Sequence, residues 1–209
     1  VLKHKYGMHP LTVTWAPTIY TDIGWQNFRA WLESGVENIT YRADQSVHRY
    51  LTREAFLNLL HPWQPFILGQ KRVAPFTALK HGIKLIMHGE ASGENGSDVS
   101  AALVPQMDHK FFAATSSEQE NISLGGHHYS DLIEMGIDKS RLQCYLPLSL
   151  EEVKQARIEV HHMSYYKLWR PQDNYYYAVE NCGFQPNPER TEGTYSKYAS
   201  LDDKLDGFH

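Results

Sequence analysis

Residues 11–41 read LTVTWAPTIYTDIGWQNFRAWLESGVENITY, and this stretch decides the fold class. Leu11–Trp15 is a short β-rich apolar run that stops just before a proline, which is typical of a strand. Gly24–Ser34 predicts a helix, because its large apolar residues recur at helical spacing: Phe28, Trp31 and Leu32. Asn38–Tyr41 predicts a second strand. The order strand, helix, strand at this spacing indicates a βαβ unit with parallel strands.

The pattern continues toward residue 90. We expect a helix that Thr52 caps and that ends before Pro62, and a second helix over Pro75–His81 that Gly82 stops. Ile83–Met87 is the most strand-like run in the chain. These elements extend the βαβ pattern to a Rossmann-like open parallel sheet.

Beyond Glu90 the pattern of predicted elements becomes irregular and rich in short helices. A glycine-rich polar loop covers residues 91–98, and the tail Gln185–His209 is polar with little core-forming pattern. Between them we expect several short elements: helices over Tyr129–Met135, after Ser149 and over Pro171–Cys182, and a strand over Ile158–Met163. We therefore divide the chain into an α/β domain over residues 1–125 and an irregular, helix-rich region over residues 126–209.

Composition excludes several classes of protein. The 209 residues are 42% hydrophobic, which is enough for a core, and the formal net charge is -4. A nucleic-acid binder or a membrane-surface binder normally carries a basic excess, so neither is expected. No apolar run approaches the roughly 18 residues of a membrane span, and no signal peptide is visible. Cys144 and Cys182 are far apart, and two reduced thiols fit better than a disulfide. We expect a cytoplasmic protein.

The strand end His88-Gly89-Glu90 is the strongest candidate site. Ligands of open parallel sheets bind beyond the carboxyl ends of the strands. Gly89 allows close approach of the backbone to a ligand, and Glu90 can hold Mg²⁺ or orient a nucleophile. Because strand-end loops are polar in any case, a purely structural role stays open.

Gln70 and Lys71 follow a glycine between two apolar segments. A lysine in this setting can reach a phosphate as a point charge, so we expect Lys71 to be catalytic and Gln70 to contact the substrate. The alternative is a solvated lysine at the start of a helix.

The 12 histidines raise the question of a metal site. Two pairs, His127-His128 and His161-His162, are adjacent in sequence, and adjacent residues on a strand point to opposite faces, so neither pair chelates one ion. No HxxxH or HExxH spacing occurs. We expect no metal ion held by histidine or cysteine.

The densest polar cluster is the segment Asn187–Tyr195, followed by Lys197 and by Asp202-Asp203. Arg190 can grip a phosphate through two parallel hydrogen bonds, and Glu189 or Glu192 can act as an acid, a base or an acceptor for a sugar hydroxyl. We include Thr191 and Lys197 in the same substrate-binding set. A solvated tail is the alternative, although two prolines and a glycine restrict its path.

Several strings together resemble a known family. They are LTVTWAP, IYTDIGWQNF, PFILGQKRVAP, IKLIMHGE and the long run EVHHMSYYKLWRPQDNYYYAVENCGFQPNPERTEGTYSKYASLDDKLDGFH at residues 159–209. The chain resembles the N-acetyl sugar amidotransferases of bacterial surface-polysaccharide biosynthesis, which belong to the PP-loop ATP pyrophosphatase superfamily. The resemblance covers nearly the whole chain and is weakest over residues 91–124.

The resemblance implies a fold of the adenine nucleotide alpha hydrolase type and an ATP-dependent reaction. It also implies that residues 1–125 form the nucleotide-binding domain and residues 126–209 the substrate-binding region. An acetamido group on a UDP-linked sugar would become an acetamidino group, with ATP and Mg²⁺ as cofactors, in lipopolysaccharide or O-antigen biosynthesis. Thr14, Trp15 and Ala16 match the strand end that contacts adenine, and Gly89 and Glu90 match the motif near the reacting phosphates. Ammonia would come from a glutaminase subunit through a cyclase-like channel subunit, which agrees with the absence of a glutaminase-like setting around either cysteine.

The sequence also departs from the family. The phosphate-binding SGGKDS loop and the CxxC pairs of the family do not occur in these residues, and Val1 lies inside a predicted helical segment that Gly7 stops. We therefore expect the first strand and phosphate loop of the domain to be missing here. Two alternatives stay open: a PP-loop enzyme that modifies tRNA, and a non-catalytic module that binds a nucleotide sugar.

Overall fold

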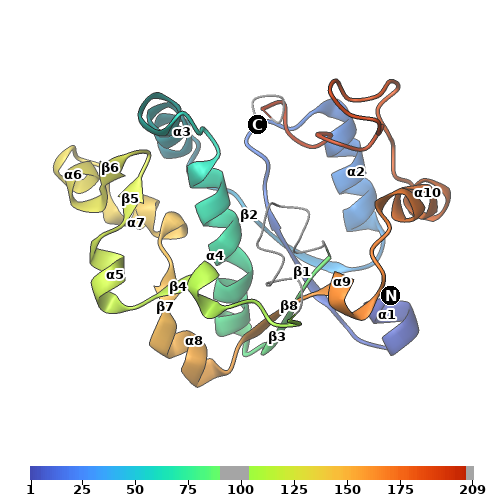
Figure 1. The fold of residues 1–209 in the computed structure, drawn as a ribbon, viewed down its shortest axis with the longest axis horizontal. Coiled ribbons are helices and arrows are strands. Elements are labelled where there is room, and N and C mark those ends of the chain that lie inside the picture. Colours follow the sequence, from blue (N-terminus) through green and yellow to red (C-terminus); the bar gives the residue numbers. More distant parts are fainter. Residues whose placement is uncertain (90–103, 206–209) are drawn as a thin grey trace. The chain divides into compact units, whose positions relative to one another are not determined.

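The computed structural model describes residues 1–89 and 104–205, which form two compact units. The first unit combines Val1–Tyr41 with the C-terminal segment that starts at Arg170, and the second comprises Arg42–Trp169 (Figure 1). Both ends of the sequence therefore belong to the same unit. This grouping differs from the functional division expected at residues 1–125 and 126–209, which stays a prediction.

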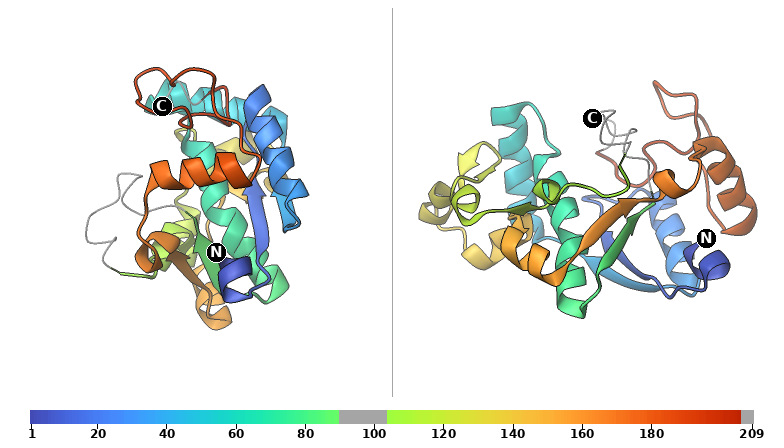
Figure 2. Two further views of the ribbon diagram at one scale, coloured as in Figure 1. Left: turned by 90° about the vertical axis from the view of Figure 1, so that its right-hand side faces the viewer. Right: turned by 60° about the horizontal axis from the view of Figure 1, so that its bottom comes forward.

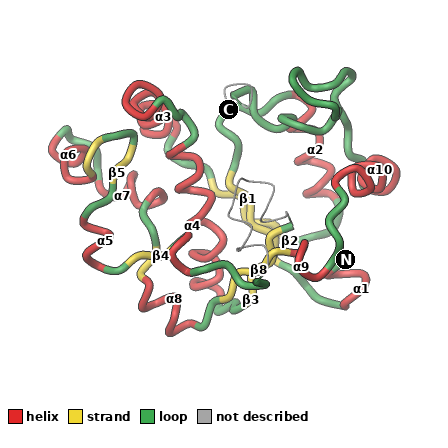
Figure 3. The backbone as a smooth tube through the Cα atoms, viewed as in Figure 1, coloured by secondary structure: helices red, strands yellow, loops and turns green. Residues whose placement is uncertain are grey.

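The first unit confirms the predicted βαβ pattern. β1 (Leu11–Trp15) pairs in parallel with β2 (Glu37–Tyr41), and α2 (Asp22–Glu33) connects them. The hydroxyl of Thr21 caps α2 by accepting a hydrogen bond from the Gly24 N–H at 2.8 Å. α1 (Leu2–Tyr6) and α10 (Pro171–Asn181) complete the regular structure. After α10 the chain has no further helix or strand up to residue 205, and it follows a long loop (Figure 3).

The second unit is organised around the long helix α4 (Gln64–His81), which lies beside the parallel pair β3 (Leu85–His88) and β8 (Glu159–His162) (Figure 2). α8 (Leu150–Ala156) and the pair β4 (Ala113–Ala114) and β7 (Leu148–Ser149) pack on the same core. The buried core residues are Ala78, Phe112, Ala113, Leu148, Val153, Ile158 and Val160.

The remaining elements of the second unit are short, apart from α3 (Gln45–Leu59). They are α5 (Ser116–Glu120), β5 (Ser123–Leu124), β6 (His127–His128), α6 (Tyr129–Glu134), α7 (Lys139–Leu142), α9 (Met163–Tyr166) and single 3₁₀ turns at His109–Phe111 and Gln143–Tyr145. The predicted strand before residue 163 and the predicted short helix from Tyr129 are both present. Ser149 caps α8 as expected, through a bond from the Glu152 N–H at 3.4 Å.

Two helix starts differ from the sequence-based expectation. α3 begins at Gln45 and not near Thr52, because the carboxylate of Asp44 accepts the N–H groups of Ser46 and Val47 and so caps the helix eight residues earlier. α4 begins at Gln64 and runs through Pro75, which is buried inside the helix. Lys71 consequently lies in the middle of a helix and not at its start.

The fold class is α/β. In the described ranges 1–89 and 104–205 the strands form four separate two-stranded pairs, three parallel and one antiparallel. Among the described helices, none combines the length and the apolar character that spanning a bilayer requires.

Candidate functional site

The C-terminal tail returns to the loop that follows the carboxyl end of β1. Tyr20 and Asp203 form an antiparallel bridge, the Thr21 N–H donates to the Asp202 carbonyl at 3.1 Å, and the Lys204 N–H donates to the Ile19 carbonyl at 2.9 Å. This pairing lies entirely within the first unit. The tail is therefore attached directly after the strand end that carries the predicted adenine-contacting residues.

A buried carboxylate fixes this attachment. Asp203 is only 4% exposed, and it accepts hydrogen bonds from the backbone N–H groups of Thr18, Ile19 and Leu205, the last at 3.0 Å. The Thr21 hydroxyl, which caps α2, also donates to the Leu201 carbonyl. We call this set of contacts between residues 18–21 and 201–205 the tail latch.

Gly24 is required by the same arrangement. A Cβ atom at this position would lie 2.7 Å from the Asp202 Cα and 2.8 Å from its carbonyl oxygen. The first turn of α2 thus approaches the tail backbone more closely than any side chain permits.

The three predicted ATP-contacting residues lie at the end of β1 and directly after it, and all three pair with β2. The Thr14 hydroxyl accepts a hydrogen bond from the Asn38 amide at 3.0 Å, and the Ala16 N–H donates to the Tyr41 carbonyl at 2.9 Å. Ala16 is buried, whereas Thr14 and Trp15 are both half-buried. Because Trp15 has the large aromatic side chain, it is the residue of this set that is best suited to contact a flat ligand.

Five of the six predicted substrate-binding residues lie on one loop, residues 187–199, which internal hydrogen bonds hold together. The Thr191 hydroxyl donates to the Ala199 carbonyl at 2.6 Å and accepts from the Asn187 amide at 3.0 Å, so it is the centre of the loop. Its N–H donates to the Ser196 carbonyl at 3.0 Å. The Lys197 ammonium donates to the Pro188 carbonyl at 2.6 Å. Thr191 and Lys197 thus shape the loop with their own polar groups.

The other predicted residues of this loop are exposed: Glu189, Arg190 and Glu192. Within residues 1–89 and 104–205, the guanidinium of Arg190 has no hydrogen bond or ion pair. Tyr195, which the sequence did not single out, is 95% exposed. Its only signal in the sequence is its place after a Glu-Gly-Thr turn.

A second strand end lies in the second unit. His88 and His162 are opposite each other at the carboxyl ends of β3 and β8, and their ring centroids are 5.6 Å apart. Gly89 follows and is exposed, with open space where a side chain would be. Glu90, predicted to be catalytic, lies outside the described residues. The sequence identified the strand that ends at His162, but it carried no signal that this strand pairs with β3.

Gln70 and Lys71 are both exposed on α4. The Lys71 ammonium lies 5.8 Å from the centroid of the Phe111 ring, a distance typical of a weak cation–π contact. Gln70 and Lys71 belong to the same unit as Gly89, whereas the residues of β1 and of the loop at residues 187–199 belong to the first unit.

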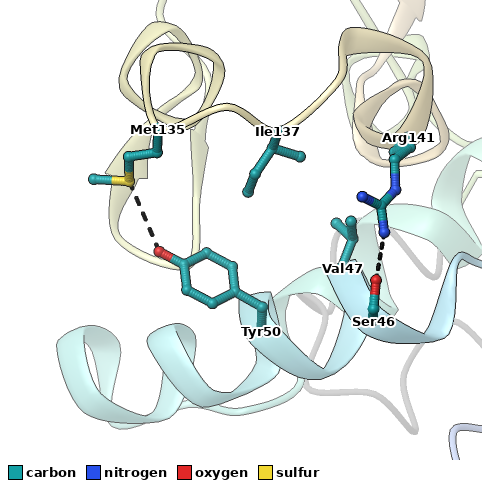
Figure 4. Close-up of a pocket in the computed structure, with 6 residues that line it drawn as sticks. All are labelled: Ser46, Val47, Tyr50, Met135, Ile137 and Arg141. Atoms are coloured by element: carbon teal, nitrogen blue, oxygen red, sulfur yellow. Dashed lines mark hydrogen bonds between the residues drawn. The ribbon is translucent and has the colours of Figure 1, made fainter.

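A pocket of about 370 Å³ lies between α3 and the α6–α7 region of the second unit (Figure 4). Its lining residues are Ser46, Val47, Tyr50, Met135, Ile137 and Arg141. Arg141 binds Asp44 through two hydrogen bonds of 3.1 and 2.8 Å, and this ion pair, with a bond from the Ser46 hydroxyl, lowers the pKa of Asp44. None of the predicted site residues lines this pocket.

Among the residues that the structure describes, no group of three or more histidine, cysteine or carboxylate side chains is arranged to hold a metal ion. The carboxylate expected to bind Mg²⁺, Glu90, is outside that part of the chain. No magnesium site is assigned.

A comparison with models of known protein families gives no match to this chain, and a comparison with curated proteins also gives none.

Proposed function

We propose that the protein is an ATP-dependent amidotransferase that converts an acetamido group of a UDP-N-acetyl sugar into an acetamidino group. The resemblance of its sequence to the N-acetyl sugar amidotransferases is the origin of the proposal. The observation that supports it most is the tail latch. Through Asp203 it attaches the tail, which carries the loop at residues 187–199, to the chain directly after the strand end proposed to bind adenine.

The proposed reaction consumes one ATP and one ammonia. The acetamido oxygen attacks the α-phosphorus of ATP, and the bond to pyrophosphate breaks. Ammonia then adds to the activated carbon, and AMP leaves with the former acetamido oxygen while a proton is released. The nitrogen of ammonia remains in the amidine.

The proposal assigns a role to each predicted residue within its own unit. The half-buried indole of Trp15 offers a flat apolar surface for adenine beside Thr14 and Ala16, and Gly89 leaves room for the phosphates. Lys71 and Glu90 act at the reacting phosphates, with Mg²⁺ supplying charge neutralisation when bound. Gln70 in the second unit is a proposed substrate contact, and so are the first-unit loop residues Glu189, Arg190, Thr191, Glu192 and Lys197.

The finer fold assignment belongs to the same proposal. The parallel β1–α2–β2 unit and the parallel β3–β8 pair fit a Rossmann-like sheet of the adenine nucleotide alpha hydrolase type. We further propose a cytoplasmic protein of lipopolysaccharide or O-antigen synthesis. A glutaminase subunit and a cyclase-like channel subunit would supply its ammonia.

Pyrophosphate release by the natural full-length protein tests the proposal. We expect release that requires ATP, a UDP-N-acetyl sugar and an ammonium salt together, with an acetamidino sugar identified by mass spectrometry. Release that is independent of the sugar, or none at all, contradicts the proposal. Binding of the sugar nucleotide without any effect of ATP would favour the binding-module alternative, and release that depends on tRNA would favour the tRNA-modifying alternative.

Two substitutions separate the proposed roles. Arg190→Ala should weaken binding of the sugar nucleotide, whereas Glu90→Ala should leave binding intact and slow turnover. Arg29→Ala is the matched control, because Arg29 is an exposed arginine of the first unit whose ion pair with Glu33, at 3.6 Å, lies on the surface of α2. If both site variants behave like the control, the assignment of these residues is wrong.

A further inference from the structure

The loop between Asn187 and Ala199 contains no regular secondary structure, but internal hydrogen bonds hold it together. The Thr194 N–H donates to the Thr191 carbonyl at 3.0 Å, and Gly193 has a φ of 76°, which fits a tight turn that favours glycine at its third position. The Asn187 N–H donates to the Lys197 carbonyl at 2.8 Å and closes the base of the loop. Tyr175 of α10 packs against Tyr198, with ring centroids 5.0 Å apart.

Two exposed side chains, those of Arg190 and Tyr195, lie on the two segments of this loop that its backbone hydrogen bonds join. Arg190 directly precedes Thr191, and Tyr195 directly precedes Ser196, and the Thr191 N–H donates to the Ser196 carbonyl. The two side chains therefore extend from the two chain segments that this hydrogen bond joins. Tyr195 is 95% exposed, and the Arg190 guanidinium has no polar partner in the described part of the chain.

Tyrosine and arginine on a preorganised loop are the residue types that dominate recognition surfaces. An aromatic ring stacks on a planar base, and a guanidinium binds phosphate oxygens through parallel hydrogen bonds. Because the polar groups of Thr191 and Lys197 are engaged within the loop, Tyr195 and Arg190 are better placed to contact a ligand.

We propose that Tyr195 and Arg190 bind the nucleoside diphosphate part of the sugar nucleotide, with the base stacked on Tyr195 and the diphosphate on Arg190. This inference rests on the proposed function and extends it, since it divides the loop into contact residues and positioning residues. Thr191 is then a positioning residue, whose hydroxyl holds the two contact residues in place.

Isothermal titration calorimetry with UDP and NMR titration with uridine test the proposal on the full chain. Tyr195→Ala should weaken binding of both compounds, by about 10- to 100-fold for UDP. Tyr195→Phe should bind UDP within about threefold of the unchanged protein, because stacking needs the ring and not the hydroxyl. Arg190→Ala should weaken binding of UDP and leave binding of uridine unchanged.

Tyr177→Ala is the matched control, because Tyr177 is a 64% exposed tyrosine on α10 of the same unit. Thr191→Val should weaken UDP binding, and Thr191→Ser, which keeps the hydroxyl, should restore it. Equal UDP binding by Tyr195→Ala and the unchanged protein overturns the inference, and so does an unchanged protein that binds no UDP.

Pyrophosphate release, measured on the same samples, separates this inference from the proposed function. UDP binding that depends on Tyr195 without sugar-dependent release would keep the nucleotide site and remove the amidotransferase. Sugar-dependent release that is unaffected in Tyr195→Ala would keep the amidotransferase and remove the site.

Discussion

The backbone N–H of Thr18 donates a hydrogen bond to the carboxylate of Asp203, across 185 positions of sequence. Asp203 accepts two further N–H groups in a site where water has little access. Asp203→Ala leaves these donors without their acceptor, and we expect a loss of about 2 to 4 kcal/mol in the free energy of unfolding. Urea denaturation followed by circular dichroism measures this change.

The neighbouring Asp202→Ala is the control for this prediction, because the exposed Asp202 carboxylate accepts no hydrogen bond in the described residues and interacts with the Asp203 carboxylate only through charge repulsion. We expect its unfolding free energy to stay within about 0.5 kcal/mol of the unchanged protein. Equal effects of the two substitutions would show that the Asp203 carboxylate does not hold the tail.

Gly24→Ala places a methyl group 2.7 Å from the Asp202 Cα, inside van der Waals contact with backbone. We expect a destabilisation of about 1 to 3 kcal/mol, although alanine is the better helix former. Faster hydrogen exchange at the Thr21 and Lys204 amides, both of which bond across the latch, would locate the damage. Gln26→Ala, an exposed change in the same helix, should leave these amides protected.

Arg141→Ala should raise the pKa of Asp44, because Arg141 is the largest cause of its lowering. Some lowering should persist, since the Ser46 hydroxyl and the Val47 N–H still donate to the carboxylate. NMR titration of the Asp44 carboxyl carbon measures this shift. Lys139→Ala, which removes an equal charge from the same short helix, should leave the pKa of Asp44 nearly unchanged.

The same ion pair has a defined dependence on pH. The folded pKa of Asp44 lies below its unfolded value of about 3.9, so its contribution to stability is present above that pH and is lost as the pH falls through the folded pKa. Arg141→Ala should therefore cost less stability at about pH 2 than at about pH 7. An equal cost at both pH values would contradict the assignment.

Tyr145→Phe tests a buried polar contact of the second unit. The Tyr145 hydroxyl and the His48 Nδ1 are 2.9 Å apart, and the two residues are 1% and 3% exposed. Loss of the hydroxyl removes a partner of a buried imidazole, and we expect a cost of about 1 to 3 kcal/mol in urea denaturation. Tyr50→Phe is the control, because the Tyr50 hydroxyl contacts only the Met135 sulfur in the described residues, at 3.8 Å.

Local elements were predictable because their signals are local. The apolar spacing of α2 and the β-rich run Leu11–Trp15 placed the first βαβ unit within about two residues. Pro171 and Gly183 bracketed α10 in the same way. In α3, by contrast, the cap at Asp44 was missed because Thr52 offered an equally plausible signal farther along.

The candidate sites required information that no local pattern contains. The antiparallel bridge between Tyr20 and Asp203 joins distant segments, and the alignment of His88 with His162 depends on which strands pair. The exposure of Tyr195 also depends on the folded loop and not on residue type. Residue chemistry alone therefore predicted both Arg190 and Thr191 as contacts of the substrate. Only the structure shows that the Thr191 hydroxyl is hydrogen-bonded within the loop.

The composition of the first unit from both ends of the sequence has a consequence for biosynthesis. On the ribosome, β1 and α2 are synthesised long before Asp203 exists, whereas Arg42–Trp169 is a continuous segment that can fold as soon as it emerges. The Thr18 and Ile19 N–H groups therefore stay hydrogen-bonded to water until Asp203 has been translated. Chains that terminate before residue 203 would contain the complete second unit and a first unit that lacks its tail latch. We expect the incomplete first unit to be a target for cellular proteases.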